Sequence, residues 1–478
     1  MKIAIIGMGV AGVSVLQAIA ERKAYEGNEV VLYDTPQTFG TGLPYQPDTS
    51  VLLLNQAAET MSMNSNDSDE FARWVEREKG VQRAGSEHVP RAWFGQYMRE
   101  HLARAMELVE PTVVKERVIQ MQVENDGRLE VKTASQADTF DIVHLCTGHL
   151  PYKDPYQLIG HPHYIHHPYP AQEKLKEIPN GARVGIIGSG LSAIDMMRFF
   201  DHHRKNIQLH FVSETGTFST LRGEEPKISL QYVTKERLEE EKQGGFVPLT
   251  KILEWFKLEC SEKKVDWKRL VKQFGQGTKE QLENQLLDER DLGIFQAILH
   301  EMDSILPDFW LALTEMDKQT FMSRYQTLFE TFRSPLPRST TAELIAHWQK
   351  GEIRVHSGMK SVTTSATGFS VSFEAEEEVE VDYLLNATGQ MKEVAISTYQ
   401  DDLINHGLNT RLFQPEAFGG IQVIWPDSTV VSQRYGVIAN LYAHGQLIHG
   451  LQFGNNTAGM IRDHAYQVVE QMMKRKKG

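Results

Sequence analysis

The amino-acid sequence predicts an α/β protein with two Rossmann-like dinucleotide-binding domains and a mostly helical insertion. Two glycine-rich turns carry this prediction: the run IAIIGMGVAGVSVLQAIA begins at Ile3, and the run RVGIIGSGLSAIDMMRFF begins at Arg183. In each run an apolar strand pattern leads into a glycine turn and then into apolar residues at helical spacing. A third observation is the charged, helix-rich stretch at about 215–350, which is more helix than a nucleotide domain needs and predicts the insertion.

The first turn meets the requirements of a dinucleotide site one by one. Gly7 permits a sharp turn out of a buried, Ile-rich strand, Gly9 lets a pyrophosphate approach the backbone, and Gly12 lets the helix pack close to the strand. Residues 28–33 predict a second strand that ends at Asp34, where an acid would hold a ribose hydroxyl. The alternative is an ordinary strand–helix turn that binds nothing. The backbone predicted to cradle the first pyrophosphate comprises Gly7, Gly9, Val10, Ala11 and Gly12.

The second turn repeats the arrangement with one substitution. Gly188, Gly190 and Ala193 hold the three places, between a strand at 184–187 and a helix at 191–200. A helix N-terminus in this position offers unpaired N–H groups and a positive dipole end to phosphates. The backbone predicted to cradle the second pyrophosphate comprises Gly188, Ser189, Gly190, Leu191 and Ser192.

The choice of nicotinamide cofactor depends on the residues that end the next strand, at 207–212. Ser213 stands where an acid would exclude a 2′-phosphate, and Arg222 lies nearby in the sequence, so the pattern favours NADPH. The alternative is that Glu214 binds a ribose hydroxyl and that the cofactor is NADH. Two dinucleotide sites in one chain predict electron transfer from one dinucleotide to the other.

Composition and charge exclude several classes of function. The 478 residues carry a net charge of −13, which argues against non-specific binding of nucleic acid. No apolar stretch approaches the length of a membrane span, and the first strand leaves no room for a signal peptide. Cys146 and Cys260 are the two cysteines, and without a CxxC motif they exclude a disulfide relay of the thioredoxin-reductase type. A cytoplasmic setting fits this cysteine usage.

The four histidines of the Pro- and His-rich connector at 151–182 present a possible metal cluster. His161, His163, His166 and His167 lack the i, i+4 helical spacing of a zinc-binding pair. No metal site is therefore predicted.

The remaining elements follow from local periodicity and turn residues. The motifs CTG at 146–148 and ATG at 387–389 each close an apolar strand and predict the points where the chain crosses between domains. The expected helices are at 69–79, at 90–108 and from about 457, and the expected strands are at 113–123, 129–133, 140–145, 353–356, 368–373 and 379–385.

Several motifs taken together carry a family resemblance over nearly the whole chain. They are GMGVAG, GTGLPYQ, PRAWFGQYM, LCTGHLP, GSGLSAID, LLNATG and GLQFGNNTAGMIRDHA. With these motifs the chain resembles the two-dinucleotide flavoproteins, which include flavin-containing, Baeyer–Villiger and N-hydroxylating monooxygenases. It is more closely similar to the YdhS-like FAD/NAD(P)-binding proteins.

The resemblance implies that the first turn binds FAD and the second binds NAD(P)H. It implies an FAD-binding domain formed by residues 1–150 and 386–478, and an NAD(P)-binding domain at 151–385 that contains the helical insertion. Asp34 would then help to hold the adenosine part of FAD, and Asn55 would approach the flavin ring. Further implied cofactor contacts are Met61, Thr147, Gly148 and Gly389.

The start of the last helix is a separate implied flavin contact. Gly454, Asn455 and Thr457 stand there, and a helix N-terminus aimed at the flavin would stabilise negative charge on the reduced ring. The alternative is a capped surface helix, with Asn456 or Thr457 as the cap. The chain departs from many flavoproteins nearby, because NLYAHGQ has His444 and Gly445 where a Gly-Asp pair would place a carboxylate on the ribityl chain.

The predicted function is that of an FAD-dependent oxidoreductase that takes hydride from NAD(P)H. The reduced flavin would hydroxylate an unidentified small molecule or reduce another acceptor, and the cofactors supply the chemistry, so few acid or base residues are needed. The candidate residues near the reacting atoms are His149 and Asn55. The alternative is a sensor or scaffold that holds FAD without turnover and uses the helical insertion to bind a partner.

Overall fold

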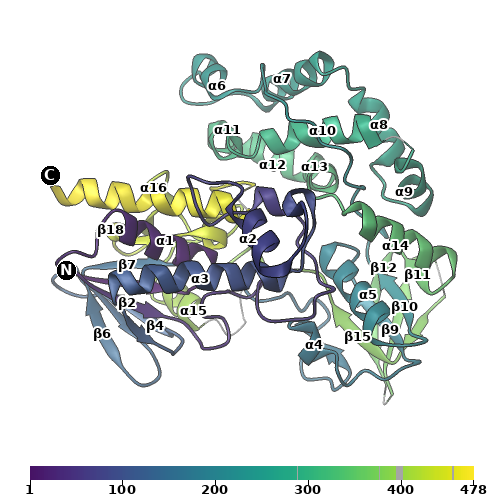
Figure 1. Ribbon diagram of the computed structural model, residues 1–478, viewed down its shortest axis with the longest axis horizontal. Helices are drawn as coiled ribbons and strands as arrows, with labels where there is room; N and C mark the ends of the chain where they lie inside the picture. The colour runs from purple at the N-terminus through teal and green to yellow at the C-terminus, as the bar shows by residue number, and fades with distance from the viewer. Residues whose placement is uncertain (288, 366, 376, 395–401, 455–456, 478) are drawn as a thin grey trace. The chain divides into compact units, whose positions relative to one another are not determined.

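The chain folds into two compact units, each built on its own parallel sheet (Figure 1). The computed structural model describes residues 1–287, 289–365, 367–375, 377–394, 402–454 and 457–477. Unit 1 comprises Met1–Ser50, Gln56–Pro151 and Gln390–Gly478, and unit 2 comprises Val51–Asn55 and Tyr152–Gly389. The chain passes between the units just after the CTG and ATG motifs. Val51–Asn55 lies in unit 2, although the sequence placed it within the first domain.

Unit 1 is built on a seven-stranded sheet whose central strands are parallel. Ile3 of β1 lies opposite Val30 of β2 and Ile142 of β7. These strands are buried along nearly their whole length, which explains their continuous apolar runs. In sheet order the strands are β16 (Val423–Ile424), β17 (Thr429–Ser432), β18 (Gly436–Ala443), β7 (Ile142–Leu145), β1 (Lys2–Ile6), β2 (Glu29–Tyr33) and β3 (Thr112–Val114).

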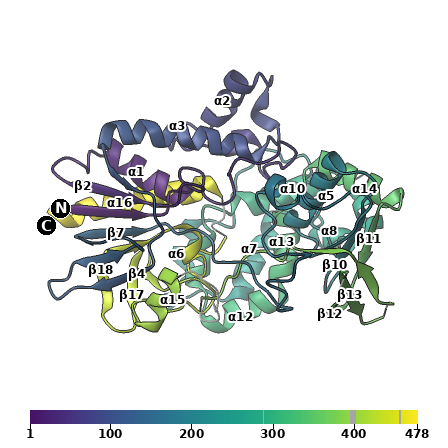
Figure 2. The same cartoon turned by 90° about the horizontal axis from the view of Figure 1, so that it is seen from below.

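The helices of unit 1 pack around the first glycine turn. Helix α1 (Val10–Glu21) contacts both α3 (Arg91–Val109) and α16 (Ala458–Lys477), and the three lie side by side in Figure 1. Figure 2 shows α1 and α3 on the same side of the sheet. The remaining elements are α2 (Glu70–Lys79), α15 (Asp402–Asn409), the short helices η1 (Ala58–Thr60), η2 (Ala84–Ser86) and η3 (Gly445–Ile448), and an antiparallel sheet of β4 (Gln120–Val123), β5 (Leu129–Lys132) and β6 (Ala137–Phe140).

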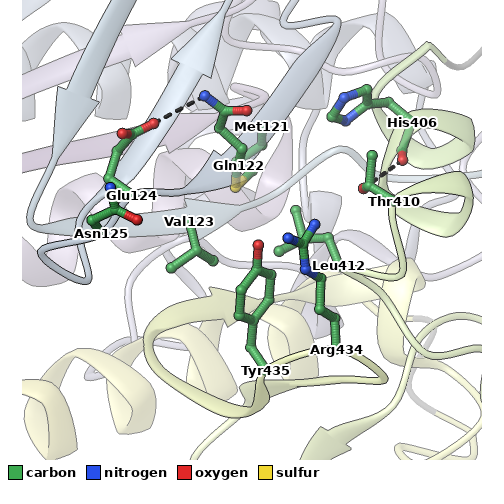
Figure 3. A pocket seen from close by; sticks show the side chains of 10 residues that line it. All are labelled: Met121, Gln122, Val123, Glu124, Asn125, His406, Thr410, Leu412, Arg434 and Tyr435. Atoms are coloured by element: carbon green, nitrogen blue, oxygen red, sulfur yellow. Dashed lines mark hydrogen bonds between the residues drawn. The ribbon is translucent and has the colours of Figure 1, made fainter.

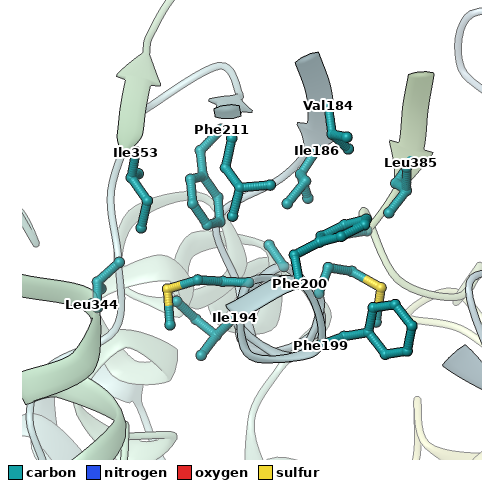
Figure 4. Packing of buried hydrophobic residues seen from close by; sticks show 14 of the residues in the cluster. Val184, Ile186, Ile194, Phe199, Phe200, Phe211, Leu344, Ile353 and Leu385 are labelled. Atoms are coloured by element: carbon teal, nitrogen blue, oxygen red, sulfur yellow. The ribbon is translucent and has the colours of Figure 1, made fainter. Parts of the chain in front are cut away.

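Unit 2 is built on a five-stranded, all-parallel sheet. Helix α5 (Leu191–His203) follows the second glycine turn and packs Ile194, Phe199 and Phe200 beneath the strands (Figure 4). In sheet order the strands are β11 (Ile353–His356), β10 (Gln208–Val212), β9 (Arg183–Ile187), β15 (Tyr383–Asn386) and β8 (Tyr164–Ile165). A short helix, α4 (Ala171–Lys174), and an antiparallel sheet of β12 (Met359–Thr364), β13 (Phe369–Phe373) and β14 (Val379–Val381) complete it.

The insertion between β10 and β11 is helical and has its own apolar core. Leu292, Phe295 and Phe332 are buried in that core. Four of its helices follow a residue whose side chain accepts the backbone N–H three positions later, namely Thr234, Asp266, Thr278 and Thr314. These N-cap residues favour a helix start at their positions. The helices are α6 (Lys235–Glu241), α7 (Leu249–Glu262), α8 (Trp267–Phe274), α9 (Lys279–Gln285), α10 (Glu289–Glu301), α11 (Leu306–Ala312), α12 (Glu315–Arg324), α13 (Gln326–Arg333) and α14 (Arg338–Gln349).

The α/β class with two Rossmann-type sheets is confirmed, but two expected strands are wrong in detail. The strand expected at 113–123 is divided between β3 and β4, which belong to different sheets. The strand expected at 140–145 is divided between β6 and β7, because Asp141 bonds twice to Lys2 of β1, with its backbone N–H and with its carboxylate. Within the described residues, no helix is both long and apolar enough to span a membrane.

Candidate functional site

The first glycine turn is closed by the chain's own backbone. Gly7 has φ +92°, and a Cβ there would lie 2.3 Å from the carbonyl oxygen of Cys146. A Cβ on Gly12 would lie 1.9 Å from the carbonyl oxygen of Gly7, and a Cβ on Gly9 would lie 3.3 Å from Cα of Gly42. Gly12 therefore seats the helix against the turn, as the sequence predicts. The N–H groups at the start of α1, on Val10 and Ala11, have no partner within the helix.

Asp34 braces this turn from the end of β2. Its Oδ2 accepts the Met8 backbone N–H at 2.8 Å, and its Oδ1 accepts the Thr35 N–H at 2.7 Å and the Thr38 hydroxyl at 2.6 Å. Burial raises the pKa of Asp34, while these three donors oppose the rise because they stabilise the carboxylate. The carboxylate has lone pairs beyond these three bonds and stands beside the turn, so it suits a ribose hydroxyl there.

The residues that follow β7 form the next part of the unit 1 site. Gly148 has φ +75° with open space where a Cβ would be, and Thr147 beside it is half-buried. Burial and the neighbouring His449 lower the pKa of His149 to about 4. His149 is therefore a neutral imidazole near pH 7, able to donate one hydrogen bond and to accept another. Met61 is buried in the same unit.

The start of the last helix shows the capping hydrogen bond of the alternative interpretation. Thr457 Oγ1 accepts the Met460 backbone N–H at 3.2 Å. The helix is not a surface helix, since Ala458, Ala465 and Val469 are buried. Gly454, with φ +79°, precedes it. Asn455 and Asn456 lie outside the described residues.

The His444–Gly445 departure has a packing explanation. His444 is buried, and its Nε2 lies 3.0 Å from Nδ1 of His144 on β7. His464 of α16 joins this core, stacked on Trp425 with ring centroids 5.0 Å apart. The imidazole at position 444 fills the interior of unit 1, so it does not replace the carboxylate of a Gly-Asp pair.

The second glycine turn is more open than the first. Gly188 has φ +113°, and a Cβ there would lie 2.8 Å from the carbonyl oxygen of Ala387. Gly190 is exposed and precedes α5, and a Cβ there would meet nothing within 4 Å. Protein packing therefore does not require glycine at 190, whereas a pyrophosphate close to the backbone would. Leu191 and Ser192 begin α5 with N–H groups that have no partner within the helix.

The segments beside the second turn hold it in place. The Ser189 hydroxyl donates to the carbonyl oxygen of Thr217, and Ser213 Oγ accepts the Gly216 N–H at 2.8 Å. Gly389 has φ +83° and lies at the last residue of unit 2 before the chain returns to unit 1. These contacts give the loop after β10 a defined conformation next to the turn.

Arg222 and Asn55, predicted separately for different cofactors, come together in unit 2. Arg222 Nη2 donates to the backbone carbonyl of Asn55 at 3.0 Å, and Arg222 Nη1 pairs with Glu225 at 2.5 Å. No sequence motif indicates this contact, because 167 residues separate the two partners. The assignment of Arg222 to a 2′-phosphate stays a prediction.

Two buried polar atoms of this pair have no hydrogen-bond partner among the described residues. They are Oδ1 of Asn55, an acceptor, and Nε of Arg222, a donor. Buried polar atoms are nearly always paired, so such atoms mark a place for a ligand or water. A polar atom of a ligand, or a water molecule, could satisfy each of them.

The four connector histidines pack mainly against aromatic rings. His161 lies 4.5 Å from Phe369 and His163 lies 4.8 Å from Tyr383, measured between ring centroids. Among the described residues, no group of three or more His, Cys, Asp or Glu side chains is placed to hold a metal ion.

A separate hollow of about 200 Å³ lies in unit 1 (Figure 3). It is lined by β4 and by residues around α15, and it contains none of the predicted site residues. Its walls include Gln122, Glu124, His406, Arg434 and Tyr435.

Comparisons with known proteins agree with this architecture. A family model described as FAD-NAD(P)-binding matches residues 4–150. No curated protein matches the sequence significantly. At these low identities, the structural similarities below show the fold.

Three solved structures illustrate the similarity over the full length. Ornithine hydroxylase from Pseudomonas aeruginosa has a TM-score of 0.60 at 13% identity, covering 98% of this chain and 99% of that one. L-lysine 6-monooxygenase from Pseudomonas syringae has a TM-score of 0.59 at 13% identity, covering 99% of each chain. Bacillithiol disulfide reductase from Staphylococcus aureus has a TM-score of 0.51 at 11% identity, covering 100% of this chain and 99% of that one.

Proposed function

We propose that this protein is an FAD-dependent oxidoreductase that takes hydride from NAD(P)H and acts on a small molecule. The observation that carries the proposal is the repeated architecture. The strand order β3-β2-β1-β7 of unit 1 corresponds to β11-β10-β9-β15 of unit 2, with a glycine turn after β1 and after β9. In open α/β sheets, dinucleotides bind at the carboxyl ends of the strands beside such turns.

Unit 1 would hold FAD. The N–H groups that begin α1 face the pyrophosphate position, and Asp34 would accept a ribose hydroxyl while it braces Met8. The family model described as FAD-NAD(P)-binding covers this unit's first glycine turn and Asp34, which supports the assignment.

Unit 2 would hold the nicotinamide cofactor at Gly188–Ser192. The open space at Gly190 supports a ligand that approaches the backbone there, and the start of α5 would stabilise its phosphates. Ser213, at the end of β10, leaves room for a 2′-phosphate where an acid would repel it, which favours NADPH over NADH.

The flavin supplies the redox chemistry, as an acceptor of hydride and a donor of electrons to the second substrate. The chain's own part is binding and orientation. In unit 2, Asn55 Oδ1 offers a buried acceptor. In unit 1, neutral His149 offers one donor and one acceptor. None of these requires a charged acid–base pair, which suits hydride transfer.

Hydroxylation of a small molecule is favoured over disulfide reduction through the chain's own thiols. Cys146 is in unit 1 and Cys260 is in unit 2, and both are free and buried. Burial raises the pKa of both thiols, so neither is a ready nucleophile. The small-molecule hydroxylases with this fold act on ornithine and lysine, which supports a small-molecule substrate here. We propose a cytoplasmic location, because free buried thiols suit a reducing compartment.

The test is an anaerobic titration of the FAD-reconstituted protein with NADPH, followed by visible absorbance of the flavin. We expect the flavin band to bleach on addition of about one equivalent, and to bleach less readily with NADH. Oxygen would then be admitted with and without candidate substrates, and consumption coupled to product would identify a monooxygenase.

Two results would contradict the proposal. A protein that retains no FAD would remove the first cofactor, and a bound flavin that neither NADPH nor NADH bleaches would remove the donor. The second result would favour a sensor or scaffold that binds FAD without turnover.

A further inference from the structure

Val51–Asn55 belongs to unit 2, and two arginines of that unit bind its two ends. Arg198 of α5 donates from Nε to the Val51 carbonyl at 2.9 Å, and Arg222 donates from Nη2 to the Asn55 carbonyl at 3.0 Å. The five-residue segment is thus held at its two ends, by the helix of the second glycine turn and by the start of the insertion. Hydrogen bonds from charged donors are stronger than neutral ones.

Arg222 is itself held rigidly. Its partner Glu225 contacts His300 through the other carboxylate oxygen, with Oε2 2.5 Å from Nδ1. The opposite nitrogen of His300 lies 2.8 Å from the carbonyl oxygen of Arg333 in α13. This chain of contacts connects Asn55 to the helices of the insertion through a side chain that is 20% exposed.

The backbone around Arg222 is fixed as well. The Arg222 N–H donates to the Leu336 carbonyl at 2.8 Å, and the Gly223 N–H donates to Gln296 Oε1 at 2.8 Å. A Cβ on Gly223 would lie 2.4 Å from the backbone nitrogen of Gly293 in α10, so the backbone at Gly223 packs directly against that helix. The backbone that carries the Arg222 side chain is therefore held in one position relative to Asn55.

We propose that Arg222 is a positioning residue for Asn55. By holding the backbone of Val51–Asn55, it fixes the orientation of the Asn55 side-chain amide, whose Oδ1 is buried. This inference rests on the proposed function for its kinetic consequence. It gives Arg222 a different role from 2′-phosphate recognition, because Glu225 already neutralises its charge and both Nη atoms have protein partners. Glu225 and His300 of the insertion hold Arg222 in place, and so the insertion helps to fix the position of Asn55.

The experiment compares Arg222→Gln with Arg222→Lys and with the control Arg269→Gln. Arg269 lies in the same insertion and pairs with Asp291 at 2.7 Å, and the control removes an ion pair there without touching Val51–Asn55. Hydrogen exchange of the peptide that covers 51–55 is measured in the apo-protein. Flavin reduction by NADPH and by NADH is then measured in the reconstituted protein by stopped flow.

For Arg222→Gln we expect exchange of the 51–55 peptide to rise about tenfold, the effect of losing one charged hydrogen bond. Flavin reduction should slow by about the same factor with NADPH and NADH alike. Arg222→Lys keeps a charged donor and should recover part of both effects. Arg269→Gln should match the wild type, and Arg222→Gln should add little to Asn55→Ala in the double variant.

Three results would overturn the inference. Unchanged exchange in Arg222→Gln would show that the arginine does not hold the segment. Faster exchange with unchanged reduction would show that holding the segment has no consequence for Asn55. A loss confined to NADPH would assign Arg222 to the 2′-phosphate. A wild-type flavin that neither cofactor reduces would instead contradict the proposed function, and the exchange measurement would still test the contact.

Discussion

The two glycine turns occupy equivalent strands, yet the protein closes them differently. In unit 1 the third position is Gly12, and a Cβ there would be 1.9 Å from a backbone oxygen of the turn itself. In unit 2 the third position is Ala193, whose methyl group is accommodated and fully buried. The middle glycine of unit 1 faces Gly42 of the same unit, whereas Gly190 of unit 2 faces open space. Protein atoms surround the first turn closely, whereas the space beside Gly190 in the second turn is open.

The cores beneath the two sheets differ as well. In unit 2, Phe199 and Phe200 of α5 pack against Val184 and Phe211 in an apolar cluster (Figure 4). In unit 1, three histidines are buried, and His444 contacts both His144 and His464. Unit 2 also buries a histidine, His210 of β10, whose pKa burial lowers to about 4. Acid should therefore act on both units, and more strongly on unit 1.

The largest expected effect is acid destabilisation of unit 1. Burial lowers the pKa of His144 to about 3 and of His464 to about 4, and it lowers the pKa of His444 also. The unfolded chain protonates histidine near pH 6.5, so stability is full above that pH and falls as the pH drops from 6.5 toward 3–4. Between pH 7.5 and 5.5 the loss should be about 1.4 kcal/mol per histidine, or about 4 kcal/mol for these three.

Urea unfolding at pH 7.5, 6.5 and 5.5 checks this expectation, with hydrogen exchange to separate the units. His144→Leu should reduce the loss on acidification by about 1.4 kcal/mol. The control is His202→Gln, at a side chain that is 45% exposed, and it should leave the pH dependence unchanged. If His144→Leu lost as much stability on acidification as the wild type, buried His144 would not contribute to the acid sensitivity of unit 1.

The next largest effect is expected from Gly12→Ala in the first turn. Its methyl group would collide with the Gly7 carbonyl, and overpacking of this kind costs about 1–3 kcal/mol. The urea midpoint should fall, and the purified protein should contain less FAD. Gly459→Ala in α16 is the control, because a Cβ there meets only the end of Arg462, and it should be neutral or stabilising by up to about 1 kcal/mol. Full stability of Gly12→Ala would show that the first turn is as open as the second.

The smallest effect on the fold is expected from Gly190→Ala in the second turn. A Cβ there meets no protein atom within 4 Å, so the melting temperature should stay near that of the wild type. The methyl group would occupy the place of the pyrophosphate, and KM for NADPH should rise about tenfold, which is about 1.4 kcal/mol of binding. The FAD content should not change. An unaltered KM would mean that the open space at Gly190 is not a cofactor site.

The fold could be predicted from the sequence where periodicity and glycine position act locally. The strand, turn and helix around Gly7 and Gly188, the helix expected at 69–79 and the helical insertion follow from residues within a few turns of one another. Strand β12 was not predicted, because most of its six residues are exposed and show little apolar alternation. The division of 113–123 between two sheets depends on pairing partners far away in the sequence, which a local pattern does not contain.

The candidate site was predictable to a smaller extent. Gly9, Gly12 and Asp34 carry their chemistry in their spacing, so each could be named before the structure. The contact between Arg222 and Asn55 joins residues from different parts of the chain, and no motif marks it. The pairing of His144 with His444 likewise explains the missing Gly-Asp carboxylate only once both are seen in one core.

The sequence by itself determined the α/β class, the two glycine turns and the residues that suit pyrophosphate and ribose, because those features depend on backbone conformation and on short-range periodicity. Only the tertiary structure decided that Val51–Asn55 belongs to unit 2, that Arg222 holds Asn55 and that the two turns differ in openness. These depend on contacts between residues distant in the chain, where the energy of burial and of charged hydrogen bonds selects the partners.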